Sequence, residues 1–455
     1  MKGSLDRGLP ADPSRLALGD GLGAHGPHRG YAILAVCVLV AAVGTGLGRW
    51  AYPIIMPEMC LALQLSYAQS GTLASGELLC YTAAALLPPA AARHLSFRWL
   101  IAVSLLLQSV AALLAGLSWD YLSALCARAL SGVGNAGAFV TTMSLAARWF
   151  AVERKGLATG CIFAGMWLGA LAGGALVPAI FSANVQVGWR VAWWAIAGLL
   201  AGTAGLVAAI VRDHPSQLGL RPLWSSGPPN QTDGNRVPGQ AGLMAVLRLP
   251  VIWHLGLILW CYGVCHVIYL TFFSSHLLEQ GLSAAQAGQV WAMMALMGIP
   301  FAPLGGLAYD RLGRRRSLIL TFAAQTACYA LFGLYQGPLG YIAAVVLFAT
   351  TGTLAQTVVL ASLGEYGGAE AVPAATGLVI VMFGLGQAIG PGLGGAIADA
   401  TGTLVLSFLV ASSFGLLGAL AAVTLRPPRS EAAVRSPSTA SPNDRVDHAG
   451  LVSGR

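Results

Sequence analysis

The sequence predicts an all-α polytopic membrane protein with twelve transmembrane helices in two pseudo-symmetric six-helix bundles. Only 9% of its 455 residues are Asp, Glu, Lys or Arg, and 56% are apolar, whereas soluble proteins carry roughly 25% charged residues. This shortage of charge excludes a soluble enzyme, a nucleic-acid-binding module, a coiled coil and a disordered chain. The apolar runs are continuous, without the period-two alternation of a β-barrel, and a membrane-spanning helix needs about 20 such residues.

Twelve apolar segments define the predicted spans. They run approximately over 31–56, 68–92, 99–117, 120–147, 156–181, 189–211, 251–275, 284–308, 317–335, 339–363, 372–398 and 403–425. The long interruption at 212–250 is polar and rich in proline, so it is predicted to be a cytoplasmic linker between the bundles 31–211 and 251–425. The polar ends, 1–30 and 426–455, are predicted to be disordered cytoplasmic tails.

The distribution of basic residues orients the chain. Arg and Lys lie in both tails and in the even-numbered loops, whereas the odd-numbered loops hold only Arg190. Because basic loops stay on the cytoplasmic side, both termini are predicted to be cytoplasmic. The tenth loop departs from this pattern, since it carries Glu365 and Glu370 and no basic residue. The expected location is a bacterial inner membrane.

The loop between the eighth and ninth segments carries a distinctive motif. It reads Gly306-Leu-Ala-Tyr-Asp310-Arg311-Leu-Gly313-Arg-Arg315-Arg316. Gly306 allows close helix approach, Gly313 permits a tight turn, and Asp310 can accept from amides at a helix start or pair with a neighbouring arginine. The alternative is a loop that is merely basic. The spacing of Gly and Asp resembles the signature loop of the major facilitator superfamily, in which it acts in the conformational switch.

Other segments carry the same resemblance. The matching loop between the second and third segments departs from it, because Arg93 stands where the family has Asp. The eleventh segment has the family's glycine and proline pattern, and the fifth repeats it with Ala170 in place of Pro, which weakens an exporter assignment. The resemblance covers about 31–425. The stretches 44–53, 66–81 and 188–190 are similar to the YbfB/YjiJ-type subgroup.

Three charged residues lie well inside predicted spans: Arg49, Glu77 and Arg128. A charge in mid-membrane costs about 2.5–3.5 kcal/mol or more, so each is a functional candidate. The alternatives are a structural ion pair of Glu77 with one arginine, and snorkelling of Arg49. Two cations against one carboxylate leave a positive cavity, which favours an anionic substrate.

Further polar and aromatic residues complete the predicted site. Candidates for proton coupling are Glu77, Arg128 and His266, because His and buried Glu can titrate near neutral pH. A lone intramembrane His can equally be a packing group, and amides can be interhelical glue. The predicted substrate-binding residues are Arg49, Tyr52, Arg128, Asn135, Trp167, Tyr262, His266, Trp291, Gln356 and Gln387.

The resemblance implies a secondary active transporter that works by alternating access, with import favoured. The expected cargo is a small organic anion, such as a monocarboxylate or an aromatic acid, moved with a proton. The alternative is a proton-antiport exporter of drugs or metabolites. No catalytic cluster, metal-ligand spacing or GxxxxGK[ST] loop is present, so we expect no enzyme activity, metal or cofactor. The expected partners are the solute, protons and the lipid bilayer, without nucleic acid, and the protein is expected to be monomeric.

Overall fold

The structure is a computed structural model. It describes residues 29–92, 94–151, 154–184, 186–220, 222–224, 243–335 and 337–425, without the side chains of 89, 90, 243, 302–311 and 369. Nearly all of the two predicted tails, the middle of the linker and Arg93 lie outside these residues. Throughout the described part the chain is helical, and its one β-bridge joins Phe150 to Leu223. The all-α fold class is confirmed.

Each predicted span coincides with a helix or a broken helix. The first part of the chain forms α1 (Arg29–Val40), the π-helix η2 (Ala41–Leu47), α2 (Tyr52–Leu63), α3 (Tyr67–Ala84), α4 (Pro88–Ala91), α5 (Phe97–Leu117), α6 (Tyr121–Trp149), α7 (Lys155–Ala183) and α8 (Gly188–Ile210). The short helices η4 (Pro215–Leu218) and α9 (Leu243–Leu247) follow.

The second part repeats the arrangement. It forms α10 (Pro250–Glu279), α11 (Ala284–Leu312), α12 (Arg314–Leu334), α13 (Pro338–Thr351), α14 (Leu354–Gly367), η5 (Ala369–Ala371), α15 (Val372–Thr401) and α16 (Val405–Thr424). Within the described residues, nine helical segments are long and apolar enough to cross a membrane by length and composition. Large apolar side chains such as Leu106, Val110 and Leu113 are exposed along α5, as expected for a lipid-facing helix.

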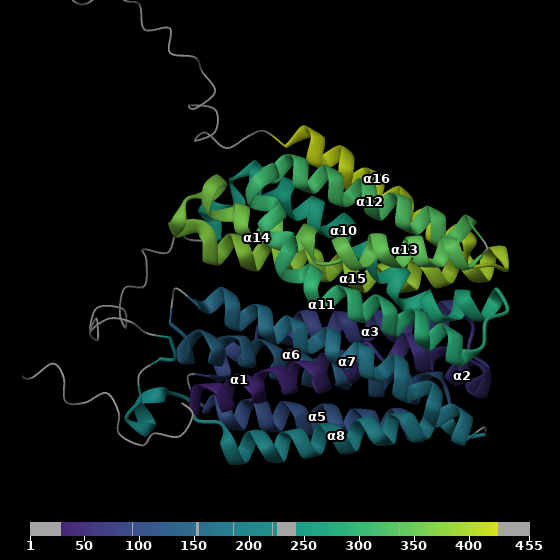
Figure 1. Cartoon of the computed structure of the whole chain (residues 1–455), viewed down its shortest axis with the longest axis horizontal. Helices are drawn as coiled ribbons and strands as arrows, with labels where there is room; N and C mark the ends of the chain where they lie inside the picture. The colour runs from purple at the N-terminus through teal and green to yellow at the C-terminus, as the bar shows by residue number, and fades with distance from the viewer. Residues whose placement is uncertain are drawn as a thin grey trace, which may run out of the picture.

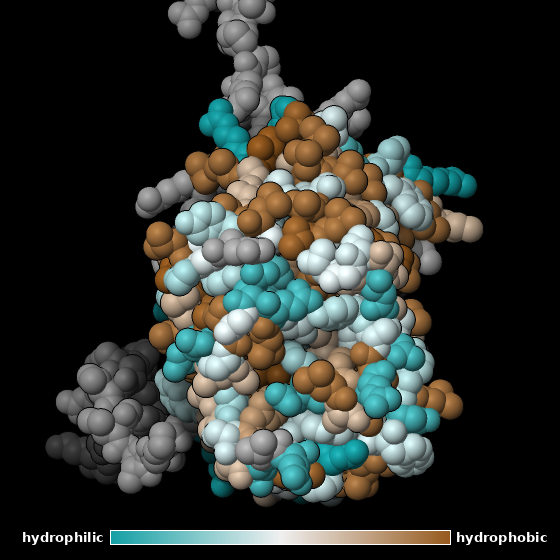
Figure 2. All heavy atoms as spheres, turned by 90° about the vertical axis from the view of Figure 1, so that its right-hand side faces the viewer, coloured by the Kyte–Doolittle hydropathy of each residue, from teal (hydrophilic) through white to brown (hydrophobic). Residues whose placement is uncertain are grey.

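Two groups of helices make up the molecule. In Figure 1 the helices α1 to α8, purple to teal, lie below the helices α10 to α16, teal to yellow. We call these groups the N-half and the C-half. They meet where α3 packs on α15 and where α7 packs on α11. Figure 2 looks onto the end at which α2 lies, where hydrophilic side chains are scattered among apolar ones.

Two predicted spans are broken, which the sequence analysis did not anticipate. The first changes from α-helix to the π-helix η2 and then to a turn at 48–51 before α2 begins. The tenth is interrupted at Gly352 and Thr353, between α13 and α14. Local departures from α-geometry of this kind are common at functional sites.

Glycines allow the two halves to touch. A Cβ added at Gly174 of α7 would lie 2.7 Å from the carbonyl oxygen of Gly288 on α11. A Cβ at Gly395 of α15 would overlap the backbone of Tyr67 at the start of α3. Small residues in these places let the helix backbones approach closely. The recurring glycines of the fifth and eleventh segments therefore include contacts between the halves.

We predict that Gly174→Ala destabilises the protein. The added methyl group must push α11 away, and overpacking of this kind costs about 1–3 kcal/mol. The matched control is Gly198→Ala in α8, where nothing lies within 4 Å of the new Cβ and where Ala is the better helix former. Thermal unfolding of the purified variants checks this. A Gly174→Ala protein as stable as the control would contradict the prediction.

Candidate functional site

A cavity of about 640 Å³ lies between the two halves. Its walls come from the first, second, fourth and fifth spans of the N-half and from α10, α13, α14 and α15 of the C-half. Most of the sequence-predicted site residues line it, namely Arg49, Tyr52, Glu77, Arg128, Trp167, Tyr262, His266, Gln356 and Gln387. The cavity therefore brings together residues that are up to 338 positions apart in the chain.

Arg49 occupies the break in the first span. It lies in the turn that follows η2, so its side chain leaves the helix where the regular backbone stops. Its Nη2 donates to Oε1 of Gln387 on α15 at 3.5 Å, and its guanidinium lies 5.0 Å above the ring of Tyr81. The ion pairs among the described side chains are Arg128–Glu77, His276–Glu279 and Arg314–Glu365. Arg49 therefore faces the cavity without a carboxylate partner among the described residues.

The positive charge of Arg128 is paired with a carboxylate. It forms an ion pair with Glu77, and both residues are only 1–2% exposed. Ser131 donates to the second oxygen of that carboxylate at 3.4 Å, and the guanidinium lies 4.2 Å from the ring of Tyr52. Pairing offsets the desolvation cost that a lone buried charge would carry. The structural ion pair considered from the sequence therefore exists, and its arginine is Arg128.

The C-half contributes an aromatic wall. Tyr262 and His266, one turn apart on α10, and Phe383 of α15 have rings that are parallel within 20°. Their centroids are 4.7–5.9 Å apart. The Tyr262 hydroxyl donates to the carbonyl of Gly352, at the break between α13 and α14. The wall is therefore anchored to the second helix break.

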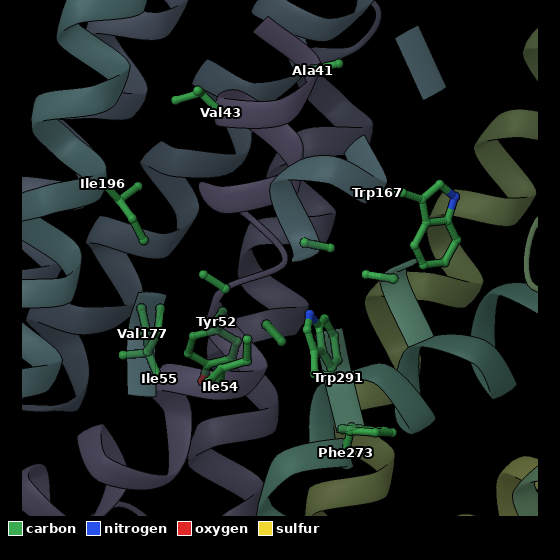
Figure 3. Packing of buried hydrophobic residues seen from close by; sticks show 14 of the residues in the cluster. Ala41, Val43, Tyr52, Ile54, Ile55, Trp167, Val177, Ile196, Phe273 and Trp291 are labelled. Carbon is green, nitrogen blue, oxygen red and sulfur yellow. The ribbon is translucent and has the colours of Figure 1, made fainter. Parts of the chain in front are cut away.

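Two of the predicted binding residues do not line the cavity. Asn135 is buried, and its Nδ2 donates to Oγ1 of Thr45 in η2 at 3.1 Å. Trp291 is 1% exposed and packs edge-to-face on Phe273 at 5.4 Å, as Figure 3 shows. A polar or aromatic side chain inside a span is as often packing as lining, and one sequence cannot separate the two.

Other residues that line the cavity, including Trp50, Tyr81 and Phe383, were not predicted from the sequence. A signal for two of them was present. Tyr81 follows Glu77 by four residues and Phe383 precedes Gln387 by four, and residues four apart share one face of a helix. Trp50 follows Arg49 directly and had no such signal, because the turn at 48–51 decides its direction.

The cavity extends toward one end of the molecule. We call the end at which Arg29 and Leu425 lie the tail end, and the opposite end the far end. The lining continues toward the tail end with residues at the ends of α3 and α6 and the beginning of α15, namely Ala85, Leu86, Ser144, Ala147, Gly377 and Ile380.

At the far end the two halves are joined by hydrogen bonds. Two N–H groups at the start of α3, those of Tyr67 and Ala68, donate to the two carboxylate oxygens of Asp399 at 2.8 and 2.9 Å. The Tyr67 hydroxyl donates to Glu279. A helix start has free N–H groups and a partial positive charge, so a carboxylate is a favourable partner. Asp399 thus caps α3 from the other half and closes the far end.

The signature loop joins α11 to α12. Gly313 has a φ of 74° between the two helices, which confirms the tight turn expected of it. Gly306, Asp310 and Arg311 belong to α11, but the side chains of 302–311 lie outside the described residues. Arg315 and Arg316 are exposed at the start of α12.

The tenth loop, which broke the charge pattern, has a structural explanation. Its Glu365, on α14, forms an ion pair with Arg314, the first residue of α12. The acidic residue thus sits beside the basic cluster of the eighth loop. Its charge ties α14 to α12 and does not contradict the orientation inferred from the other loops.

Two helical halves around a cavity that holds charged groups define a membrane transporter of small solutes. The sequence profile of the Major Facilitator Superfamily matches residues 38–367. The chain belongs to this superfamily. It is a multi-pass membrane transporter and not an enzyme. The YbfB/YjiJ-type subgroup stays a prediction.

Named relatives agree with this assignment. A probable sulfoacetate transporter of Cupriavidus necator is 25% identical over 395 residues, which are 83% of this chain and 88% of the relative. The 3-(3-hydroxy-phenyl)propionate transporter of Escherichia coli is 25% identical over 399 residues, 86% of this chain and 92% of the relative. A hexuronate transporter of Bacillus subtilis is 22% identical over 404 residues, 85% and 92% of the two chains.

Solved structures share the fold. A bacterial homologue of the human lysosomal transporter Spinster, in an inward-facing and unoccupied conformation, has a TM-score of 0.69 at 17% identity and covers 89% of this chain and 100% of its own. The nucleoside transporter NupG has a TM-score of 0.69 at 13% identity, covering 88% and 99%.

We predict that Asp399→Asn loosens the far end. The substitution removes the charge and one of two acceptors, and a hydrogen bond to a charged group contributes about 1.5–3 kcal/mol. Amide hydrogen exchange in peptides covering the start of α3 should become about tenfold faster or more. The control is Glu58→Gln in α2, because Glu58 forms no ion pair among the described residues. Equal exchange in both variants would contradict the capping role.

Proposed function

We propose that the protein moves a small organic anion across the inner membrane by alternating access, with a proton as the coupling ion. The observation that carries this proposal is the charge of Arg49. Arg128 is neutralised by Glu77, so the described side chains that line the cavity include one cation more than they include carboxylates. A substrate that brings a negative charge to Arg49 supplies the missing partner, and the planar guanidinium fits a carboxylate through two parallel hydrogen bonds.

The cavity walls narrow the class of anion. The ring stack of Tyr262, His266 and Phe383 offers an aromatic surface for a planar or short aliphatic body. This supports a monocarboxylate or an aromatic acid. The names of the relatives support an anion more broadly, because they refer to sulfoacetate, a hydroxyphenylpropionate and a hexuronate.

The proposed direction of transport rests on the distribution of basic residues in the loops. The basic loops favour a cytoplasmic location for the tail end, and the cavity extends toward that end. This supports an inward-facing arrangement. An inward-open carrier with an anion site suits import by symport. The exporter alternative predicts the opposite coupling, in which an inward proton gradient drives solute out.

Proton coupling is assigned to the Glu77–Arg128 pair, with His266 as a further titratable group on the opposite wall. When Glu77 is protonated, the Arg128 guanidinium loses its partner and adds a second positive charge to the cavity. A proton and an anion thereby favour one another's binding, which is the thermodynamic basis of symport.

We predict that Arg49→Gln abolishes anion transport and leaves the protein folded. The probes are sulfoacetate, 3-phenylpropionate, glucuronate and nitrate, screened first by thermal shift on purified protein. Each anion that raises the melting temperature of the native protein is then tested for uptake into liposomes. The matched control is Lys155→Gln at the tail-end start of α7, which removes a positive charge outside the cavity. Uptake by Arg49→Gln at the native rate would refute the anion site.

We also predict that Glu77→Gln uncouples transport from protons. The amide keeps the shape of the side chain but has no charge to titrate. Uptake of a transported anion should lose its response to an imposed pH gradient, while exchange of labelled for unlabelled solute continues. Both fluxes are measured in liposomes with native protein beside the variant. If Glu77→Gln responds to the gradient as the native protein does, the coupling site lies elsewhere.

A further inference from the structure

Near the end of the π-helix η2, the usual helical donors to the Gly44 carbonyl bond to other residues. The N–H of Gly48 donates to the carbonyl of Val43 at 2.9 Å, and the N–H of Arg49 donates to that of Thr45 at 3.2 Å. These are the two N–H groups that would serve the Gly44 carbonyl in an α-helix or a π-helix. Neither reaches it. A buried carbonyl in this position needs another donor.

A side chain of α5 supplies that donor. Nε2 of Gln108 donates to the Gly44 carbonyl at 2.7 Å, and Gln108 is 1% exposed. The turn is shaped around this amide, because a Cβ at position 48 would lie 2.5 Å from Nε2. Gln108 therefore touches the backbone on both sides of the point at which η2 ends and the turn with Arg49 begins.

The π-turn determines where Arg49 points. A π-turn holds one more residue than an α-turn, and each residue rotates the helix by about 100°. If the segment returned to regular α-geometry, the residues after it would turn by about that angle. Arg49 would then leave Gln387 and Tyr81, the two side chains that it meets in the cavity.

We propose that Gln108 is a positioning residue for the cavity guanidinium: it holds the π-helical break in the first span and thereby aims Arg49 into the site. Gln108 does not line the cavity. The inference deepens the proposed anion site and rests on it for its importance to transport. The proposed geometry concerns only the direction of the Arg49 side chain.

The C-half provides a matched counterpart. Gln108 is the twelfth residue of the 21-residue helix α5, and Gln325 is the twelfth residue of the 21-residue helix α12. These are the third spans of the two halves. Nε2 of Gln325 donates to the carbonyl of Thr351 at 3.3 Å, beside the break between α13 and α14. Both glutamines are thus buried donors at a broken span, but only Gln108 serves the break that holds Arg49.

The test measures the reactivity of Arg49 in the purified full-length protein. Phenylglyoxal, which modifies accessible guanidinium groups, is applied to the native protein, Gln108→Met and Gln325→Met, and modification is quantified by peptide mass spectrometry. Methionine has the length of glutamine without the donor. Arg128, which is buried in its ion pair, serves as an internal reference for a protected arginine. Melting temperatures establish that each variant is folded.

Gln108→Met should slow modification of Arg49 about tenfold, the scale of one lost hydrogen bond, while Gln325→Met leaves it unchanged. Gln108→Asn, whose amide is one methylene too short to reach Gly44, should show the same direction of change and is used if Gln108→Met does not fold. Native reactivity of Arg49 in a folded Gln108 variant would overturn the proposal. So would an equal loss in Gln325→Met. Because no transport is measured, such a result leaves the proposed function to be judged on its own experiments.

Discussion

The rest of this structure depends on one constraint, which is the cost of placing a guanidinium in the middle of a membrane protein. Arg128 meets that cost through Glu77 and the face of Tyr52. For Arg49 this cost is offset only in part, by contacts with a neutral amide and an aromatic ring. The proposed anion site rests on this difference, because a cation beside neutral groups can accept an anionic partner. The two arginines differ in that Arg128 forms an ion pair with Glu77, whereas Arg49 forms none with the described carboxylates.

Arg49 lies where the first span is broken. Glu77 and Arg128 reach the cavity from regular α-helices, whereas Arg49 reaches it from the turn that follows a π-helix. The broken backbone then needs donors, and Gln108 provides one. The second break, at Gly352, is satisfied by Tyr262 and Gln325. In both halves the cavity is built where helical hydrogen bonding stops and side chains replace it.

The two halves are joined at the far end, whereas the cavity between them extends toward the tail end. Asp399 caps α3 across the boundary between the halves, and glycines bring α7 against α11. Aromatic packing joins the halves there too, because Tyr67 packs edge-to-face on Phe272 of α10 at 6.3 Å between ring centroids. Alternating access, as proposed for this protein, requires these far-end contacts to break while contacts form at the tail end.

Much of this arrangement was accessible from the sequence, and the rest was not for identifiable reasons. Continuous apolar runs predicted the twelve segments, because lipid demands about 20 apolar residues for each span. The rarity of charge singled out Arg49, Glu77 and Arg128, all of which line the cavity. Which arginine pairs with Glu77 depends on how three spans pack, and no periodicity encodes that. Asn135 and Trp291 were expected in the site and lie in the packing around it. The helix breaks and the role of Asp399 arise from contacts between distant segments, so a single sequence shows no sign of them.

The central claim is that the cavity recognises a negative charge, and it is tested most directly on the ligand. Binding to purified native protein is measured by calorimetry for a carboxylic acid such as 3-phenylpropionate and for its amide, which has nearly the same shape without the charge. For any acid that binds, the account predicts that the amide binds at least about tenfold more weakly, because a charge-assisted pair with arginine is lost. Equal affinity for acid and amide would contradict it.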